Sequence, residues 1–326
     1  PYLGYGYSKG YWKTNNLDRL LEIGIKNKST LKSFAILNFI SLFYQNIFNF
    51  LNKNTLKKNK KQISFHYDLG NNFYKLWLDK SMTYSSAIFN NKDSLQKAQN
   101  NKYETIAKLA NIKNNHTVLE IGCGWGGFIR YIEKNVGAKV TGLTLSNQQF
   151  NYVKSLSNGL SQVKLKDYRT IDKSFDRIVS IEMFEAVGQA NWNTFFKSLK
   201  NILNNNGIIA LQIITIAEKN FSNYFRSKDF IQKYIFPGGM LPTKSILNSL
   251  ALANGFTIRE VNNFGKDYAK TLNIWRKNFT NNWEKIEKLG FDNNFKRLWE
   301  YYLNYCEVGF KNQEIDVAQF ILKNKK

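Results

Sequence analysis

The stretch VLEIGCGWGGF, residues 118–128, decides the fold. Apolar residues and one carboxylate, Glu120, run directly into a turn that contains Gly122, Gly124 and Gly126. This pattern is typical of a buried parallel strand that turns into a helix beside a ligand crevice, because glycine lets the backbone approach a bound molecule closely. We therefore predict a ligand on this turn, at the carboxyl end of the first strand.

Strand-like and helical stretches alternate from this point to the end of the chain. Alternation of this kind is typical of a parallel sheet that is covered by helices on both faces. The sequence therefore predicts an α/β fold with a seven-stranded, mostly parallel, Rossmann-like sheet and a small helical N-terminal region. The expected strands are 117–122, 138–146, 161–168, 175–184, 207–216, 256–265 and 315–323.

Composition and charge limit the class of protein. The chain has 326 residues, 43% of them hydrophobic, and a formal net charge of +23 at pH 7. Such a charge indicates an anionic partner, either nucleic acid or a membrane leaflet, although Lys and Asn abound in every segment and a compositional bias explains the charge as well. Two cysteines, Cys123 and Cys306, are too few for a disulfide framework, and no secretory signal is visible. We therefore expect a cytoplasmic protein.

The N-terminal part contains an apolar run at 34–51 and a lysine-rich segment at 53–61. Polar residues interrupt the apolar run at helical spacing, so we predict an amphipathic helix and not a membrane span. The helix either lies on an anionic bilayer or docks on the main domain ahead of a solvated linker. We divide the chain into a partial helical lipid-docking region with a basic linker, 1–62, and a main domain, 63–326.

The glycine turn allows two kinds of cofactor. Gly122, Gly124 and Gly127 match the spacing of dinucleotide-binding folds, which also require an acid about twenty residues later. The end of the second strand has no such acid and offers Thr144, Ser146 and Gln149. With Glu120 at the strand end, the pattern E-I-G-C-G-W-G resembles motif I of the S-adenosylmethionine-dependent methyltransferases. This resemblance implies S-adenosylmethionine as cofactor and the class I methyltransferase version of the sheet.

A longer resemblance covers roughly residues 4–322. HYDLGNNFYKLWLDKSMTYSSAIF, at 66–89, is similar to the segment that precedes motif I in the cyclopropane fatty acid synthase family. The similarity continues in order through FDRIVSIEMFEAVG, DFIQKYIFPGGMLP, DYAKTLNIWRKNF and WEYYLNYCEVGF. It implies methyl transfer to a cis double bond of an unsaturated phospholipid at an anionic membrane surface. An alkene is a poor nucleophile, so such an enzyme must mainly align the reactants, exclude water and tolerate a carbocation.

The resemblance also implies bicarbonate, which in the family removes the proton that leaves as the ring closes. It places Glu185, Tyr268 and the main-chain amide of Ile214 at the bicarbonate, and Ser86 stands where the family has a cysteine. Gln212 replaces a family histidine, and an amide donates a hydrogen bond but does not titrate near neutral pH. Two products therefore stay open: a cyclopropane, or a methyl- or methylene-branched chain. For Glu185 the alternative is a carboxylate that caps the neighbouring helix.

The residues expected to hold S-adenosylmethionine follow from the same resemblance. They lie at its methionine end, along the glycine floor, at the ribose and beside adenine. For the tyrosines among them, plain core packing is the alternative. The full set is Tyr84, Ser85, Glu120, Gly122, Gly124, Gly126, Thr144, Ser146, Gln149, Tyr168 and Arg169.

Two other functions compete with a lipid-modifying enzyme. A nucleic-acid methyltransferase would need a basic recognition module with interleaved aromatic residues, and the sequence offers only an apolar helical appendage with a lysine tail. A catalytically silent lipid-binding protein would not need Glu185, Tyr268 and the glycine turn. We therefore expect no nucleic-acid partner and no metal, and a peripheral location at the inner face of the membrane. The resemblance also implies a homodimer.

Overall fold

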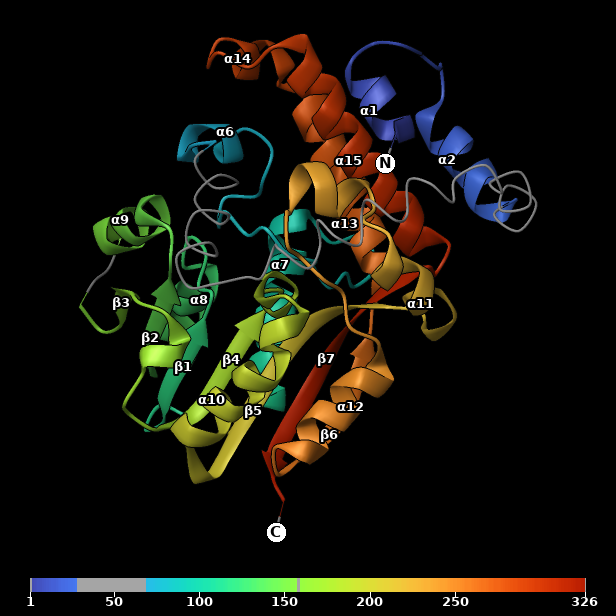
Figure 1. The fold of residues 1–326 in the computed structure, drawn as a ribbon. Coiled ribbons are helices and arrows are strands. Elements are labelled where there is room, and N and C mark those ends of the chain that lie inside the picture. The colour runs from blue at the N-terminus through green and yellow to red at the C-terminus, as the bar shows by residue number, and fades with distance from the viewer. Residues whose placement is uncertain (1, 28–68, 157–158, 326) are drawn as a thin grey trace.

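The computed structural model describes residues 2–27, 69–156 and 159–325. Within these ranges the chain forms one seven-stranded sheet with the strand order β3-β2-β1-β4-β5-β7-β6 (Figure 1). Only β7 runs antiparallel to its neighbours in this sheet, so the predicted mostly parallel α/β fold is confirmed. The strands are β1 (Thr117–Ile121), β2 (Lys139–Thr144), β3 (Gln162–Leu165), β4 (Phe175–Ile181), β5 (Leu203–Ile216), β6 (Phe256–Asn263) and β7 (Ile315–Asn324).

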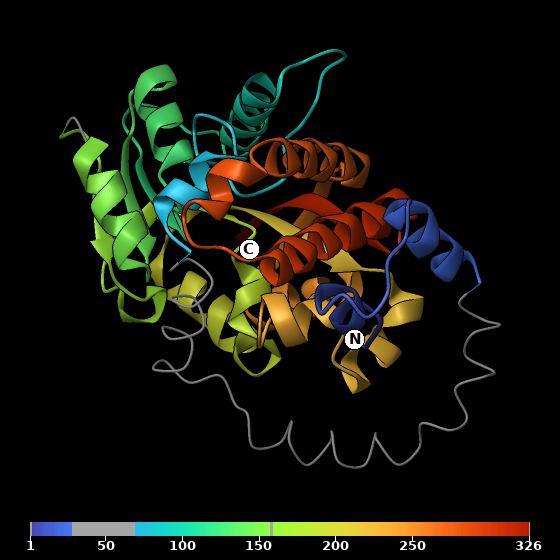
Figure 2. The same cartoon turned by 90° about the horizontal axis from the view of Figure 1, so that it is seen from above.

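Helices cover both faces of the sheet, as the alternating pattern predicts (Figures 1 and 2). Leu119 and Ile121 of β1 pack with side chains of α10 (Trp192–Ile202) and α12 (Lys244–Ala253). Val118 belongs to the core on the other face. The helices on that face are α7 (Leu95–Leu109), α8 (Gly127–Asn135) and α9 (Asn147–Leu156).

A third layer of helices lies over the carboxyl ends of the parallel strands (Figure 1). Its centre is α13 (Gly265–Asn281) packed on α15 (Asn293–Lys311), with a core of buried aromatic rings that includes Trp77 and Trp275. Around this pair lie α1 (Tyr2–Ser8), α2 (Leu17–Lys26), α6 (Asn71–Lys75), α11 (Glu218–Arg226), α14 (Trp283–Glu287) and a π-helical turn (Ile231–Ile235). Short 3-10 turns occur at Tyr168–Thr170, Phe184–Val187 and Gln189–Asn191.

The described N-terminal helices pack on the main body of the protein. Both α1 and α2 contact α15, and the Arg297 guanidinium of α15 donates to the main-chain oxygens of Tyr7 and Trp12 at 2.5 and 2.6 Å. The amphipathic helix expected at 34–51, the lysine-rich segment and the domain boundary at 62/63 lie outside the described residues. Across the part of the chain that is described, no helix has both the length and the hydropathy needed to cross a membrane.

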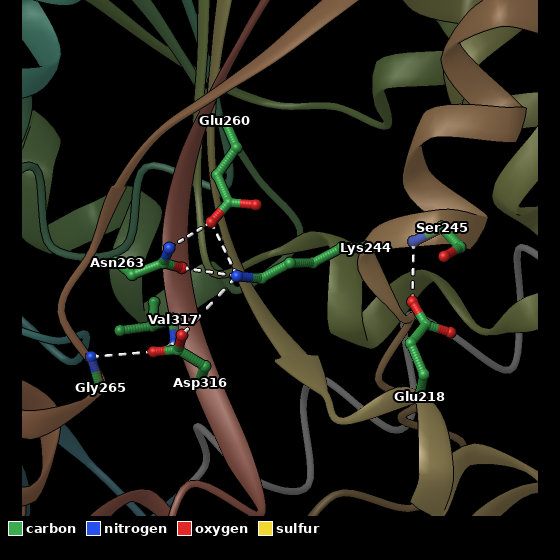
Figure 3. A network of polar contacts seen from close by, with 8 residues as sticks. All are labelled: Glu218, Lys244, Ser245, Glu260, Asn263, Gly265, Asp316 and Val317. Atoms are coloured by element: carbon green, nitrogen blue, oxygen red, sulfur yellow. Dashed lines mark hydrogen bonds and ion pairs between the residues drawn. The ribbon is translucent and has the colours of Figure 1, made fainter.

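A polar network fixes the start of α13 (Figure 3). Asp316 of β7 accepts a hydrogen bond from the main-chain amide of Gly265 at 3.0 Å, and Lys244 pairs with Glu260 at 2.7 Å. Lys244 also lies 3.9 Å from the second oxygen of Asp316. A Cβ at Gly265 would stand 2.5 Å from Asp316 Oδ1, so this close approach requires glycine. Because α13 carries Tyr268, the network sets where that side chain enters the site.

Candidate active site

The glycine turn borders a cavity of about 160 Å³ at the carboxyl ends of β1 and β2. Gly122 and Gly124 have φ values of 82° and 52°, in the left-handed region that favours glycine. A Cβ at Gly122 would also lie 2.7 Å from the Met183 side chain. The predicted cofactor residues that line this cavity are Tyr84, Ser85, Glu120, Gly122, Gly124, Thr144, Gln149, Tyr168 and Arg169.

Two of the predicted cofactor residues do not line the cavity. Gly126 precedes α8 with a φ of 75° and lets the chain enter that helix. The Ser146 hydroxyl accepts a hydrogen bond from the main-chain amide of Gln149 at 3.3 Å, at the start of α9. In the structure both residues shape the loops around the cavity, and neither faces it.

The polar atoms of this cavity fit a ligand with hydroxyl and ammonium groups. Glu120 is buried at its floor, and among the described residues its Oε2 has no hydrogen-bond partner. Burial raises the pKa of Glu120 to about 8, which a donor from a bound ligand would counter. Across the cavity, Arg169 is held by Asp167 at 2.8 Å and stacks near the Tyr168 ring. These residues fit S-adenosylmethionine, which supplies an electrophilic methyl group when bound.

A second, mostly apolar cavity of about 530 Å³ adjoins the first. Tyr84, Glu182 and Ala186 line both cavities, so the two meet at these side chains. Elements from distant parts of the chain contribute walls, including α2, β5, α13 and α15. An apolar space of this kind suits a hydrocarbon chain, and its junction with the cofactor cavity is where a transferred methyl group would arrive.

A half-buried carboxylate, that of Glu182, occupies that junction. Glu182 Oε1 accepts hydrogen bonds from the Ser86 amide at 2.9 Å and from the Gln212 side chain at 2.7 Å. Its Oε2 accepts from the Tyr268 hydroxyl at 2.6 Å. The Gln319 side chain of β7 donates to the side-chain oxygen Oε1 of Gln212 at 3.2 Å. This contact turns the Gln212 side-chain amino group toward Glu182. Glu182 itself has a φ of 51°, a conformation rarely adopted by residues other than glycine.

The second buried carboxyl belongs to Glu185, one turn further along the chain. Its Oε1 accepts from the Ile214 amide at 2.5 Å, a contact to β5 and not to a following helix. Its Oε2 lacks a hydrogen-bond partner in the described part of the chain. Burial, and then the charge of Glu182, raise the pKa of Glu185 to about 8. Burial also raises the pKa of Glu182, and the hydrogen bonds from Tyr268, Gln212 and Ser86 counter that rise.

The structure places two carboxylates within the expected bicarbonate site. Ser86, Gln212, Tyr268 and Ile214 do lie together with Glu185, as the resemblance implies. However, Glu182 takes the hydrogen bonds of Ser86, Gln212 and Tyr268, and Glu185 takes that of Ile214. A bicarbonate would have to displace these carboxylates and add a negative charge to a buried acidic pair. The residues as they stand therefore do not fit bicarbonate.

Sequence reasoning missed two charged residues of the site, Glu182 and the fully buried Lys102. Glu182 directly follows β4, the strand that pairs with β1. A polar residue at the end of such a strand is the sequence signal that could have identified it. Lys102 lies on α7 and donates from Nζ to the Ser85 hydroxyl at 2.7 Å. Burial lowers the pKa of Lys102 to about 8, and the charge of Glu182 is the largest influence that opposes this. Lys102 thus places a cation behind the Glu182 carboxylate.

The Rossmann-like sheet, the glycine turn and the paired cavities define an S-adenosylmethionine-dependent methyltransferase of the cyclopropane synthase type. The chain belongs to the family described as mycolic acid cyclopropane synthetase, whose characteristic sequence matches residues 54–320.

Individual relatives agree with this assignment. The chain is 34% identical to cyclopropane-fatty-acyl-phospholipid synthase of Escherichia coli strain K12, over 98% of this chain and 82% of that protein. It is 33% identical to tuberculostearic acid methyltransferase of Mycobacterium tuberculosis, over 98% of this chain and 78% of that protein. The crystal structure of a mycolic acid cyclopropane synthase complexed with SAH and CTAB superimposes with a TM-score of 0.76, at 32% identity, covering 81% of this chain and 98% of that one.

Proposed function

We propose that this enzyme transfers the methyl group of S-adenosylmethionine to a cis double bond in an unsaturated phospholipid acyl chain and closes a cyclopropane ring. The supporting observation is the junction at Tyr84 and Glu182, where the cofactor cavity opens into an apolar space of about 530 Å³. A hydrocarbon in that space would place its double bond against the donor methyl group with water excluded. The relatives named for cyclopropane products support the same reaction.

Different residues of this chain would hold the acyl chain, border the carbocation and accept the proton. Apolar walls such as Ile214 and Phe310 hold the acyl chain, and the Tyr84 and Tyr268 rings border the place where a carbocation would form. Ring faces stabilise a cation without hydrating it. A buried carboxylate beside the same place would accept the proton that leaves as the ring closes.

A branched product is the second candidate. Tuberculostearic acid methyltransferase, a relative at 33% identity, is named for methylation and not for cyclopropane formation. By the family resemblance Gln212 also stands where a histidine is expected, so one titratable group would be missing near the reacting carbon. In that case the same methyl transfer would end in a methyl or methylene branch.

We further propose that the enzyme works at the inner face of an anionic membrane, with residues 1–62 as its docking region. The net charge of +23 supports this, together with exposed apolar side chains near the N-terminus: Leu3 on α1 is 53% exposed, and Tyr11, between α1 and α2, is 75% exposed. Gly24 and Ile25 of α2 line the acyl cavity, so α2 forms part of the cavity wall.

Product analysis tests the proposed reaction. Purified enzyme, S-adenosylmethionine and anionic vesicles of unsaturated phospholipid should give fatty acids that have gained one CH2, with upfield cyclopropane protons in the NMR spectrum. Vesicles of saturated phospholipid are the control and should give no product. Lipids without added carbon, under conditions where S-adenosylmethionine binds, would contradict the proposal.

A further inference from the structure

We propose that Glu182 permanently replaces bicarbonate in this enzyme: its carboxylate fills the anion cradle and acts as the base for ring closure. This inference rests on the proposed acyl methyl transfer and names the group that completes it. The chain would then carry its own base and need no exchangeable anion.

The contacts of Glu182 match those that a bound anion would make. A planar carboxylate and a bicarbonate present similar oxygen pairs, and Glu182 directs its pair at the amide, hydroxyl and side-chain amino donors that an anion would use. The Gln212 amino group is aimed by Gln319, and Lys102 supplies a buried cation on the side of Ser85. These hydrogen-bond donors and the cation favour the ionised form of Glu182. Glu185 accepts a hydrogen bond from the Ile214 amide, and its Oε2 has no partner among the described residues.

The backbone of Glu182 is an independent sign of a special role. A φ of 51° is unfavourable for a residue with a side chain, so glycine would be the low-energy occupant. Glu182 directly follows the last residue of β4. Its main-chain amide donates to the main-chain oxygen of Gln212 at 2.8 Å, and this hydrogen bond holds the strained turn against β5. A carboxylate kept at such a position is stabilised by the cradle that it fills.

The proposed step balances in atoms and charge. The π electrons of the alkene form a bond to the donor methyl carbon as the C–S bond breaks, which leaves a neutral thioether and a carbocation on the acyl chain. One C–H bond of the added methyl group then breaks, and its electron pair closes the three-membered ring. The proton passes to Glu182, which lines both cavities, and reaches water after the product has left.

Removal of dissolved bicarbonate tests the proposal on the unaltered enzyme. In CO2-free buffer the wild-type enzyme should form product at an unchanged rate, and added bicarbonate should raise the rate by less than about twofold. A tenfold fall that bicarbonate reverses would overturn the proposal, and the proposed reaction would stand. Failure to methylate lipid under both conditions would instead reject the proposed reaction.

Two variants separate the base from the shape of the site. Glu182→Gln keeps the shape, and ring closure should fall by about 10²-fold or more with or without bicarbonate. Glu182→Gly removes the strained side chain and opens the cradle, so bicarbonate should raise its rate at least tenfold. Asn111→Gly is the matched control, because Asn111 also has a positive φ, of 48°, and lies exposed after α7. Near wild-type ring closure by Glu182→Gln would reject Glu182 as the base.

Binding gives a readout that does not depend on turnover. With ¹³C-bicarbonate and S-adenosylhomocysteine, the Glu182→Gly variant should broaden the bicarbonate NMR signal and the wild-type enzyme should not. Saturable binding by the wild-type enzyme would overturn the proposal even if no lipid were methylated.

Discussion

At the scale of single residues, the Glu185 carboxyl should make stability depend on pH. Its pKa rises from 4.5 to about 8 on folding, so the folded protein binds the proton more tightly than the unfolded chain. Stability from this group is therefore complete below about pH 4.5 and is lost as the pH rises through about 8, at up to ~1.4 kcal/mol per pH unit.

Urea unfolding at pH 5.5 and pH 7.5 checks this sign. The Glu185→Gln variant should lose less stability than the wild-type protein between the two values, because its side chain has no proton to lose. Glu104→Gln is the control. The hydrogen bond from Lys108 lowers the pKa of Glu104, which lies on the outer side of α7, so this residue stays ionised at both pH values. The Glu104→Gln variant should therefore lose as much stability between pH 5.5 and pH 7.5 as the wild-type protein. Equal falls in wild type and Glu185→Gln would contradict the assigned shift.

The residues of the site were only partly predictable from the sequence. Local motifs place Gly122 at the cofactor and Glu185 near β5, because each lies within a contiguous pattern. The carboxylate at the centre of the cradle was not predicted, since its partners Ser86 and Tyr268 are 96 and 86 positions away in the chain. Hydrogen bonds across such separations depend on the packing of α13 over the sheet, which no local pattern encodes.

At the scale of elements, the start of α13 is held by the contact between Gly265 and Asp316. Gly265→Ala would place a Cβ against Asp316 Oδ1 and displace the carboxylate from the amide it accepts. We expect a loss of about 1–3 kcal/mol in unfolding free energy. The matched control is Gly24→Ala in α2, where a Cβ meets nothing within 4 Å and should add roughly 0.5–1 kcal/mol of helix stability.

Urea unfolding of both variants at one pH measures these changes. An unchanged stability of Gly265→Ala would mean that the contact does not hold the helix. Hydrophobic periodicity does predict the sheet to which α13 is anchored, because central strands such as β1 and β4 are buried along most of their length. It predicts the length of β5 less well: the strand begins at Leu203 and not at 207, since Leu203 already pairs with Phe175 of β4 before an irregularity in the register.

At the scale of the whole molecule, charge and exposed apolar side chains should act together at a membrane. Binding to anionic vesicles should weaken as salt is added, because salt screens the lysine charges. The double change Leu3→Ser and Tyr11→Ser removes apolar area that is 53% and 75% exposed, and should weaken vesicle binding by about tenfold. Leu252→Ser on α12, 48% exposed, is the control and should leave binding unchanged.

Co-sedimentation with vesicles of anionic or zwitterionic lipid measures this binding. Equal binding to both lipids at all salt concentrations would assign the net charge to composition alone. The charge itself is visible in the sequence. The sequence also predicts residues 1–62 as the docking region, but it does not show that α2 lines the acyl cavity, because the position of α2 depends on its packing against α15.

The fate of the donor methyl group distinguishes ring closure from simple methylation. We would supply S-adenosylmethionine with a fully deuterated methyl group, together with unsaturated phospholipid vesicles, and examine the released fatty acids by mass spectrometry and NMR. We expect a cyclopropane ring that retains two of the three deuterium atoms, because one leaves as the ring closes. Retention of all three in a methyl branch, or of two in a methylene group without a ring, would contradict ring closure at this site.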